Sequence, residues 1–313
     1  MSPKDGTYES RLEKLLQKAP LSNATLVLAD QDLSKSGGSF AGLSVNAVAA
    51  ASTRLSIPLC SYSRQSTASD YEWRRRWEEA YITLKFQPGR LAELARRALI
   101  IARGFATIRA ALEKAPADKT PSRLLATILG RPDSADKLAQ YGMGDQSRLT
   151  IVPKEGNWDN RRASLFLGYW LWNSILRYPG LLANEVAAAS HLNLGIKVFK
   201  GPQVQALFQK AVYRGPFADR QDPRWWRTAL DEILGAADVA DGLELVRARV
   251  DKRAKRSSCS VEPADSAGYY CPILEHPVSL KSSRGSLPWF PRGADLTRVC
   301  STCLDSYGPW LGV

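Results

Sequence analysis

The sequence lacks several features that would place it in well-defined classes of protein. It has two histidines in 313 residues, and neither an internal repeat nor a low-complexity tract is present. Its densest apolar run, residues 165–172, is far too short to span a bilayer. The first ten residues lack the basic-then-apolar order of a secretory signal. We therefore expect a globular protein of the cytoplasm, or of the nucleus in a eukaryote, with no membrane partner.

Cysteine is scarce and unevenly placed. The chain has five cysteines, an odd number for its length, which argues against the disulfide framework of small secreted proteins. In a reducing compartment, cysteines serve as core residues, metal ligands or reactive thiols. All but Cys60 lie between residues 259 and 303. This grouping directs attention to the C-terminal part of the chain.

Acidic residues are outnumbered by basic ones. Forty-three Lys and Arg stand against 31 Asp and Glu, which gives a formal net charge of +12 and a pI near 9.6. Such a balance favours polyanionic partners, nucleic acid above all. A basic protein without such a partner has the same composition, and a protein partner also remains open.

Hydrophobic periodicity predicts an α+β fold that is mainly helical, in three parts. Residues 1–118 read as strand, Ala-rich helix and strand, an N-terminal βαβ-type unit with parallel strands and a right-handed crossover. Two long helical stretches, 69–85 and 89–114, should follow it. Residues 119–256 read as a helical domain. Residues 257–313 lose helical periodicity, which predicts a small irregular tail. Such a tail has few apolar side chains to form a core, so it needs a further stabilising element such as a bound metal ion.

A metal site would stabilise the C-terminal tail. Cys271-x4-His276 and Cys300-x2-Cys303, separated by 23 residues, have the two-knuckle spacing of a structural Zn²⁺ site. Cys259 is an alternative ligand in place of His276. Four protein ligands would leave no open position, so the site would be structural. One competing hypothesis is that the cysteines are reduced core residues. Another is that Cys300 and Cys303 form a redox pair, but such a pair usually lies at a strand-to-helix turn, which the sequence does not indicate here.

The middle of the chain carries a possible helix-turn-helix. Residues 181–195 have the small and apolar residues expected of its first helix, and residues 201–215 have the polar residues expected of its reading helix. Residues 196–200 would make the turn between them unusually long. An ordinary helical bundle looks the same. A final helix over 241–256 has six cations in its last ten residues, which the helix macrodipole partly explains. The expected nucleic-acid contacts are Lys197, Lys200, Gln203, Gln205, Gln209, Lys210 and Arg214.

An alternative active site lies near the end of the first predicted strand. Asp30 and Asp32 alternate, so both carboxylates can face one divalent cation in the crevice at the strand ends, with Arg64 after the second strand. Turn-capping by the two aspartates is the plainer interpretation.

These patterns together favour a non-enzymatic nucleic-acid-binding protein, most simply a DNA-binding or regulatory one, with a structural zinc site. A metal-dependent enzyme acting on a phosphate-containing substrate through Asp30 and Asp32 is the first alternative. The second is a protein-interaction adaptor, which would expose Trp289 and Phe290 as an apolar surface.

Overall fold

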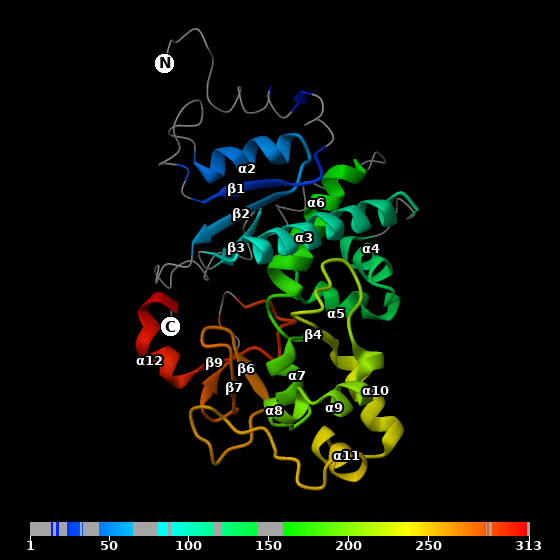
Figure 1. Cartoon of the computed structure of the whole chain (residues 1–313), viewed down its shortest axis with the longest axis vertical. Helices are drawn as coiled ribbons and strands as arrows, with labels where there is room; N and C mark the ends of the chain where they lie inside the picture. The colour runs from blue at the N-terminus through cyan, green and yellow to red at the C-terminus, as the bar shows by residue number, and fades with distance from the viewer. Residues whose placement is uncertain are drawn as a thin grey trace. The chain divides into compact units, whose positions relative to one another are not determined.

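The computed structural model describes residues 24–31, 44–64, 81–86, 89–114, 120–142, 159–285 and 290–311, together with residues 14, 17, 18, 33 and 287. Within these, helices and short strands together form a mixed helix-and-strand fold (Figure 1). The chain forms two compact units. The first comprises residues 1–130 and 145–173, and the second comprises residues 131–144 and 174–313. The expected divisions near residues 118 and 256 thus fall inside these units.

The first unit is built on a three-stranded parallel sheet in the order β1-β2-β3. The strands are β1 (Val27–Asp30), β2 (Leu59–Arg64) and β3 (Ile82–Phe86). Leu59, Ile82 and Leu84 are buried, which is typical of parallel strands covered by helices. Residues 82–85 were expected in a helix, so that part of the prediction is wrong. Pairing with β2 along its length decides the strand, a contact that local periodicity does not reveal.

Helices cover this sheet. α2 (Val45–Arg54) lies in the chain between β1 and β2 and packs on both. Its N-cap Ser44 accepts a hydrogen bond from the Ala47 amide, and its alanines allow close approach to the strands. α3 (Leu91–Leu112) packs on β3 and on α6 (Asn160–Trp170), and α4 (Pro121–Ile128) follows α3. The expected helix over 89–114 is confirmed by α3.

α6 is an apolar helix that belongs to the first unit, although the sequence-based division placed it with residues 119–256. Most of its residues are buried, and the helix continues as a π-helical turn over Leu171–Ile175. The Tyr169 hydroxyl accepts a hydrogen bond from the Leu59 amide at 2.8 Å, which fixes α6 to the start of β2. The Cβ of any residue other than glycine at position 168 would lie 2.2 Å from the Phe105 ring, so Gly168 allows α3 and α6 to approach closely.

The second unit contains short helices around a small antiparallel pair. β4 (Leu182–Ala183) pairs with β5 (Trp225–Trp226). Trp225 is fully buried and its ring contacts Phe199 edge-on at 5.0 Å. The helices are α5 (Ala135–Ala139), α7 (Glu185–His191), α8 (Ile196–Phe199), α9 (Pro202–Leu207), α10 (Arg227–Ala237) and α11 (Gly242–Arg249), with 3-10 turns at Pro132–Ser134 and Gln209–Ala211.

Several helix boundaries differ from the sequence-based expectation. The 201–215 segment is α9 and a 3-10 turn, not one long helix, and residues 196–199 are helical. The expected helix over 241–256 ends at Arg249. In two of these segments tertiary hydrogen bonds override local propensity: the Tyr213 amide donates to the Arg224 carbonyl, and the Gly195 amide donates to the Lys255 carbonyl.

Residues 257–311 are more regular than expected and belong to the second unit. β6 (Tyr269–Cys271) and β7 (His276–Val278) form a hairpin, and α7 packs against both strands. β8 (Ser283–Arg284) pairs with β9 (Val299–Cys300), and α12 (Ser301–Leu311) follows directly. The hairpin of this segment therefore packs against a helix of the second unit.

Candidate metal centre

The β6–β7 hairpin positions the first pair of predicted ligands. Cys271 ends β6, His276 begins β7, and the two are direct cross-strand partners. Residues 272–275 form the turn, with Glu275 in the left-handed region at φ 53°. Directly opposite side chains in an antiparallel pair project from the same face of the hairpin. The x4 spacing of the sequence motif is thus the length of this turn.

The second pair sits where β9 becomes α12. Cys300 is the last residue of β9 and Cys303 lies in the first turn of α12, the helix that the sequence did not predict. The Ser301 amide donates to the Ser282 carbonyl at 2.9 Å and holds this junction against the chain before β8. A strand-to-helix turn is therefore present. The absence of one had been the reason to set a redox pair aside, and that reason is wrong.

Long-range hydrogen bonds bring the two pairs together. The Tyr270 amide donates to the Leu296 carbonyl, and the Arg298 amide donates to the Tyr270 carbonyl, both at 2.9 Å. β6 thus runs beside the chain that leads into β9. The Sγ atoms of Cys271, Cys300 and Cys303 consequently lie within 4.8 Å of one another, and all three residues are fully buried. Such a cluster can hold a metal ion.

The spacing of the sulfurs suits a shared ion. The Sγ atoms of Cys271 and Cys303 are 3.9 Å apart, and all five cysteines of the chain are free. Two sulfurs at tetrahedral positions about 2.3 Å from one zinc ion would be about 3.8 Å apart. A disulfide would need about 2.05 Å. The distance between these two sulfurs therefore fits a shared ion and excludes a disulfide between them.

Hydrogen bonds prepare Cys271 to act as the thiolate of the cluster. The pKa of Cys271 is lowered to about 5, chiefly by the side-chain hydrogen bond that its sulfur shares with Cys303. Burial opposes this shift, while the backbone amides of Leu274, Cys300 and Ile273 add to it. The same proton sharing raises the pKa of Cys303, and burial raises the pKa of Cys300. A cation bound between the sulfurs would take the place of the shared protons.

The two other predicted ligands, His276 and Cys259, do not belong to the group of three sulfurs. His276 is outside the group of three sulfurs, although it is the cross-strand partner of Cys271. Its Nε2 is buried and has no hydrogen-bond partner among the described residues. Cys259 is also outside the group, and its sulfur accepts from the Glu262 amide at 3.4 Å. Burial raises the pKa of Cys259, but amide donors from Glu262, Ser279 and Val261 outweigh it and lower the pKa.

The alternative site in the first unit is only partly described. Asp30 ends β1 and Arg64 ends β2, so both belong to the carboxyl edge of the parallel sheet. Asp30 pairs in register with Tyr62. Asp32, the second carboxylate of the proposed cation site, and the side chain of Arg64 lie outside the described residues.

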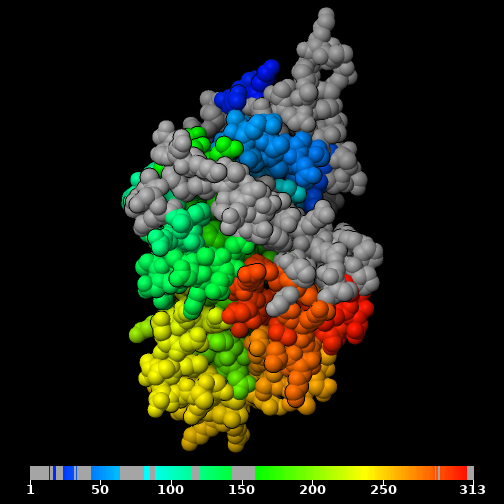
Figure 2. Space-filling model, turned by 180° about the vertical axis from the view of Figure 1, so that it is seen from behind, coloured from blue at the N-terminus to red at the C-terminus, as the bar shows by residue number. Residues whose placement is uncertain are grey.

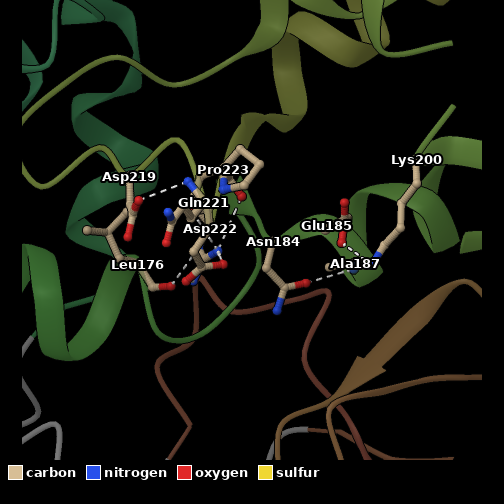
Figure 3. A network of polar contacts seen from close by, with 10 residues as sticks. Leu176, Asn184, Glu185, Ala187, Lys200, Asp219, Gln221, Asp222 and Pro223 are labelled. Carbon is tan, nitrogen blue, oxygen red and sulfur yellow. Dashed lines mark hydrogen bonds and ion pairs between the residues drawn. The ribbon is translucent and has the colours of Figure 1, made fainter. Parts of the chain in front are cut away.

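The predicted nucleic-acid contacts lie on α8, α9 and the segment that follows them. Six of the seven are exposed. Gln205 is the exception, because it is half-buried and donates to the Phe199 carbonyl at 2.7 Å. Figure 3 shows Lys200 directed to Glu185 on α7, with 3.0 Å between Nζ and Oε2. The exposed residues are Lys197, Lys200, Gln203, Gln209, Lys210 and Arg214.

Ion pairs neutralise part of the positive charge between residues 196 and 227. Arg224 pairs with Asp222, in the network of Figure 3, and Arg227 pairs with Asp295 at 2.6 Å. Within the part of the chain that the structure describes, no carboxylate lies in ion-pair range of the four remaining cations. These are Lys197, Lys210, Arg214 and Arg220.

The apolar surface expected of an adaptor is not provided by Phe290. This residue is 9% exposed and its ring packs against Tyr178 with centroids 5.7 Å apart. Trp289 lies outside the described residues. Trp225 and Trp226, which form β5, are also buried.

Comparison with protein-family models, curated proteins and solved structures gives no match. Among the described residues, no helix has the length and apolar character needed to cross a membrane. The site and its surroundings therefore carry the functional argument.

Proposed function

We propose that this protein binds nucleic acid through a basic surface of its second unit, and that a Zn²⁺ ion holds the C-terminal segment of that unit in place. The observation that carries the metal part is the buried group of three sulfurs, Cys271, Cys300 and Cys303. Thiolate ligands select zinc or other soft ions over Mg²⁺ and Ca²⁺.

His276 supplies the fourth ligand in this proposal. Its Nε2 is buried without a hydrogen-bond partner among the described residues, which is costly unless a ligand satisfies it. It is the cross-strand partner of Cys271, and in this proposal its ring turns toward the sulfurs when the ion binds. Four protein ligands close the coordination sphere, and the ion then has a structural role.

Metal analysis of the reduced, purified protein tests the site. We expect about one zinc ion per chain for a closed four-ligand site, and loss of the ion in Cys271→Ser and Cys303→Ser. Cys60→Ser is the matched control, because Cys60 is equally buried but lies in β2 of the first unit. A wild-type content below about a tenth of an ion per chain would refute the site, since structural zinc binds tightly.

His276→Gln tests the fourth ligand separately. The substitution removes the imidazole but leaves the three thiols, so we expect zinc affinity to fall by about tenfold or more, with the content recovering in excess zinc. Competition with a chromophoric chelator measures the affinity. Unchanged affinity would assign the fourth position to another group.

The nucleic-acid part rests on the exposed cations around α8 and α9. α9 has six residues, about 9 Å at 1.5 Å per residue, which is too short to read many bases in a major groove. We therefore propose that contacts to backbone phosphates dominate, in place of a long reading helix. A DNA-binding or regulatory role follows from this binding.

Salt-dependent binding to duplex DNA tests this function. We expect retardation at low salt, and a loss of affinity that is linear in log salt with a slope of about 0.9 per phosphate contact. Lys197→Gln combined with Lys210→Gln and Arg214→Gln should reduce that slope. A wild-type protein that shows no retardation at low salt would exclude the function.

A second proposal concerns the parallel sheet of the first unit. Asp30 and Arg64 end neighbouring strands, and ligands of open parallel sheets bind beyond the carboxyl ends of the strands. We propose a βαβ-type unit with a right-handed crossover that presents a phosphate-containing substrate and a divalent cation to Asp30 and Asp32. Mn²⁺ binding by the wild type but not by the D30A/D32A double variant would support it, and equal binding would exclude it.

A further inference from the structure

The chain just beyond α11 carries cations that helix stability does not explain. α11 ends at Arg249, and Lys252, Arg253 and Lys255 follow it in a turn, here called the 251–256 loop. The macrodipole of a helix favours cations within its last turn only. These three cations lie after that turn. Their position was hidden in the sequence, where they seemed to continue the helix.

Two arginines fix the backbone of the 251–256 loop. The Arg247 side chain donates twice to the Ala254 carbonyl, at 3.1 Å from Nε and 3.0 Å from Nη2. At the other end, Arg256 Nη2 donates to the Ala264 carbonyl at 2.6 Å. Asp251 Oδ1 accepts from the Arg253 amide at 2.9 Å and closes the turn. These hydrogen bonds hold the loop in one defined conformation within the second unit.

The side chains of the three other cations make none of the hydrogen bonds that hold the 251–256 loop. Lys252, Arg253 and Lys255 are exposed, and within the described residues none of them has an ion-pair partner. Arg247 and Arg256 thus serve the loop internally, while Lys252, Arg253 and Lys255 hold their charge toward solvent. In Figure 2 the gold atoms of the chain near residue 250 stand out at the lower edge of the second unit.

The loop lies against the start of α8. The Gly195 amide donates to the Lys255 carbonyl at 2.9 Å, and the Ser257 amide donates to the Asn193 carbonyl at 3.1 Å. A Cβ at Gly195 would lie 3.2 Å from the Lys255 carbonyl oxygen, so the two backbones are in close contact. Lys197, exposed and without an ion-pair partner among the described residues, is two positions beyond Gly195. Two basic segments that are distant in sequence therefore meet.

We infer that Lys197, Lys252, Arg253 and Lys255 form one surface that binds the phosphate backbone of duplex nucleic acid. The inference rests on the proposed nucleic-acid-binding function and adds a second segment to it. Exposed cations on a rigid loop match a row of phosphates, which contact cations without regard to sequence. A membrane surface fits less well, because the loop offers no large apolar side chain and Ala254 is buried.

A charge-neutral loop variant, K252Q/R253Q/K255Q, tests the inference. These substitutions remove three cations and none of the hydrogen bonds that hold the loop, since those use backbone atoms or other side chains. The control K137Q/K281Q/R292Q removes the same charge from other exposed positions of the second unit. Binding of a short labelled duplex by each full-length protein is measured by fluorescence anisotropy over a range of salt concentrations.

We expect the salt slope of the loop variant to be smaller by about 2.7, at 0.9 for each of three phosphate contacts. Raising salt from 50 to 200 mM would then weaken the wild type about 40-fold more than the variant. The control should keep the wild-type slope. Single variants Lys252→Gln and Lys255→Gln, each reducing the slope by about 0.9, serve if the triple variant melts at a lower temperature than the control.

The outcomes separate this inference from the function on which it rests. A loop variant that retains the wild-type slope, while the wild type binds DNA, overturns the loop and leaves the function standing. Equal slope losses in the loop variant and the control also overturn it, because net charge would then suffice. A wild type that binds vesicles of anionic phospholipid but no DNA overturns both.

Discussion

The sulfur atoms of Cys271 and Cys303 lie 3.9 Å apart, although the two residues are 32 positions apart in the chain. One ends the strand β6 and the other lies in the first turn of α12. A metal ion between them would join the hairpin to the helix, and with Cys300 it would hold three elements at one point.

Removing the metal should lower the stability of the second unit. An ion that binds the folded chain and not the unfolded one adds about 2.7 kcal/mol when free ion is at 100 times its dissociation constant. We expect a zinc chelator to lower the thermal transition and added zinc to restore it, as followed by circular dichroism. Mg²⁺ and Ca²⁺ should not restore it, because thiolates are poor ligands for hard cations. An unchanged transition after complete removal of zinc would contradict a structural role.

Gly180 should be intolerant of a side chain. A Cβ at this position would lie 2.0 Å from the Gly293 carbonyl oxygen and 2.3 Å from the Tyr141 hydroxyl. The first of these is a backbone atom that cannot rotate away, so we expect Gly180→Ala to cost about 3 kcal/mol or more. Gly235→Ala is the control, because Gly235 is exposed within α10 and a Cβ there meets nothing within 4 Å. It should add about 1 kcal/mol through helix propensity.

Chemical denaturation of the two glycine variants and the wild type measures both effects. The contrast isolates the clash, since both substitutions restrict the unfolded chain equally. Similar unfolding free energies for the two variants would show that the packing around Gly180 yields more easily than its geometry indicates.

Cys60 should make stability fall at alkaline pH. Burial raises the pKa of its thiol from 9.0 to about 12, with a smaller opposing effect of Arg97. Because the folded pKa lies above the unfolded one, the contribution is complete below pH 9 and is lost as pH rises toward 12. The slope is at most about 1.4 kcal/mol per pH unit. Cys60→Ala should show a shallower decline over this range in denaturation at a series of pH values, and an identical decline would contradict the assignment.

Tyr169→Phe should weaken the first unit. The substitution leaves the Leu59 amide without the hydroxyl that accepts its proton at 2.8 Å. Leu59 is fully buried, so we expect a cost of about 1–3 kcal/mol in unfolding free energy. Tyr307→Phe, on α12, is the control, because its hydroxyl has no hydrogen bond to another described residue. Equal effects of the two substitutions would show that water replaces the lost partner.

Much of what depends on local spacing could be predicted from the sequence. The helices α2, α3 and α6 follow from apolar periodicity, and the pairs Cys271 with His276 and Cys300 with Cys303 follow from their spacing. The three sulfurs that the structure gathers were all among the predicted ligands. Each of these features is encoded within a few residues of the chain, where side-chain type and period are sufficient evidence.

Tertiary contacts decided the rest. β3 forms because β2 offers it a hydrogen-bonding partner, and α12 begins directly after β9, where the Ser301 amide donates to the Ser282 carbonyl. The end of α11 was equally hidden, because Lys252 and Arg253 are good helix formers. The Arg247 side chain donates hydrogen bonds to the Ala254 carbonyl, and the Gly195 amide donates one to the Lys255 carbonyl. These bonds hold the chain after α11 as a loop. The sequence alone determined which residues could act as ligands and cations, whereas only long-range hydrogen bonds, absent from any local pattern, determined which of them meet.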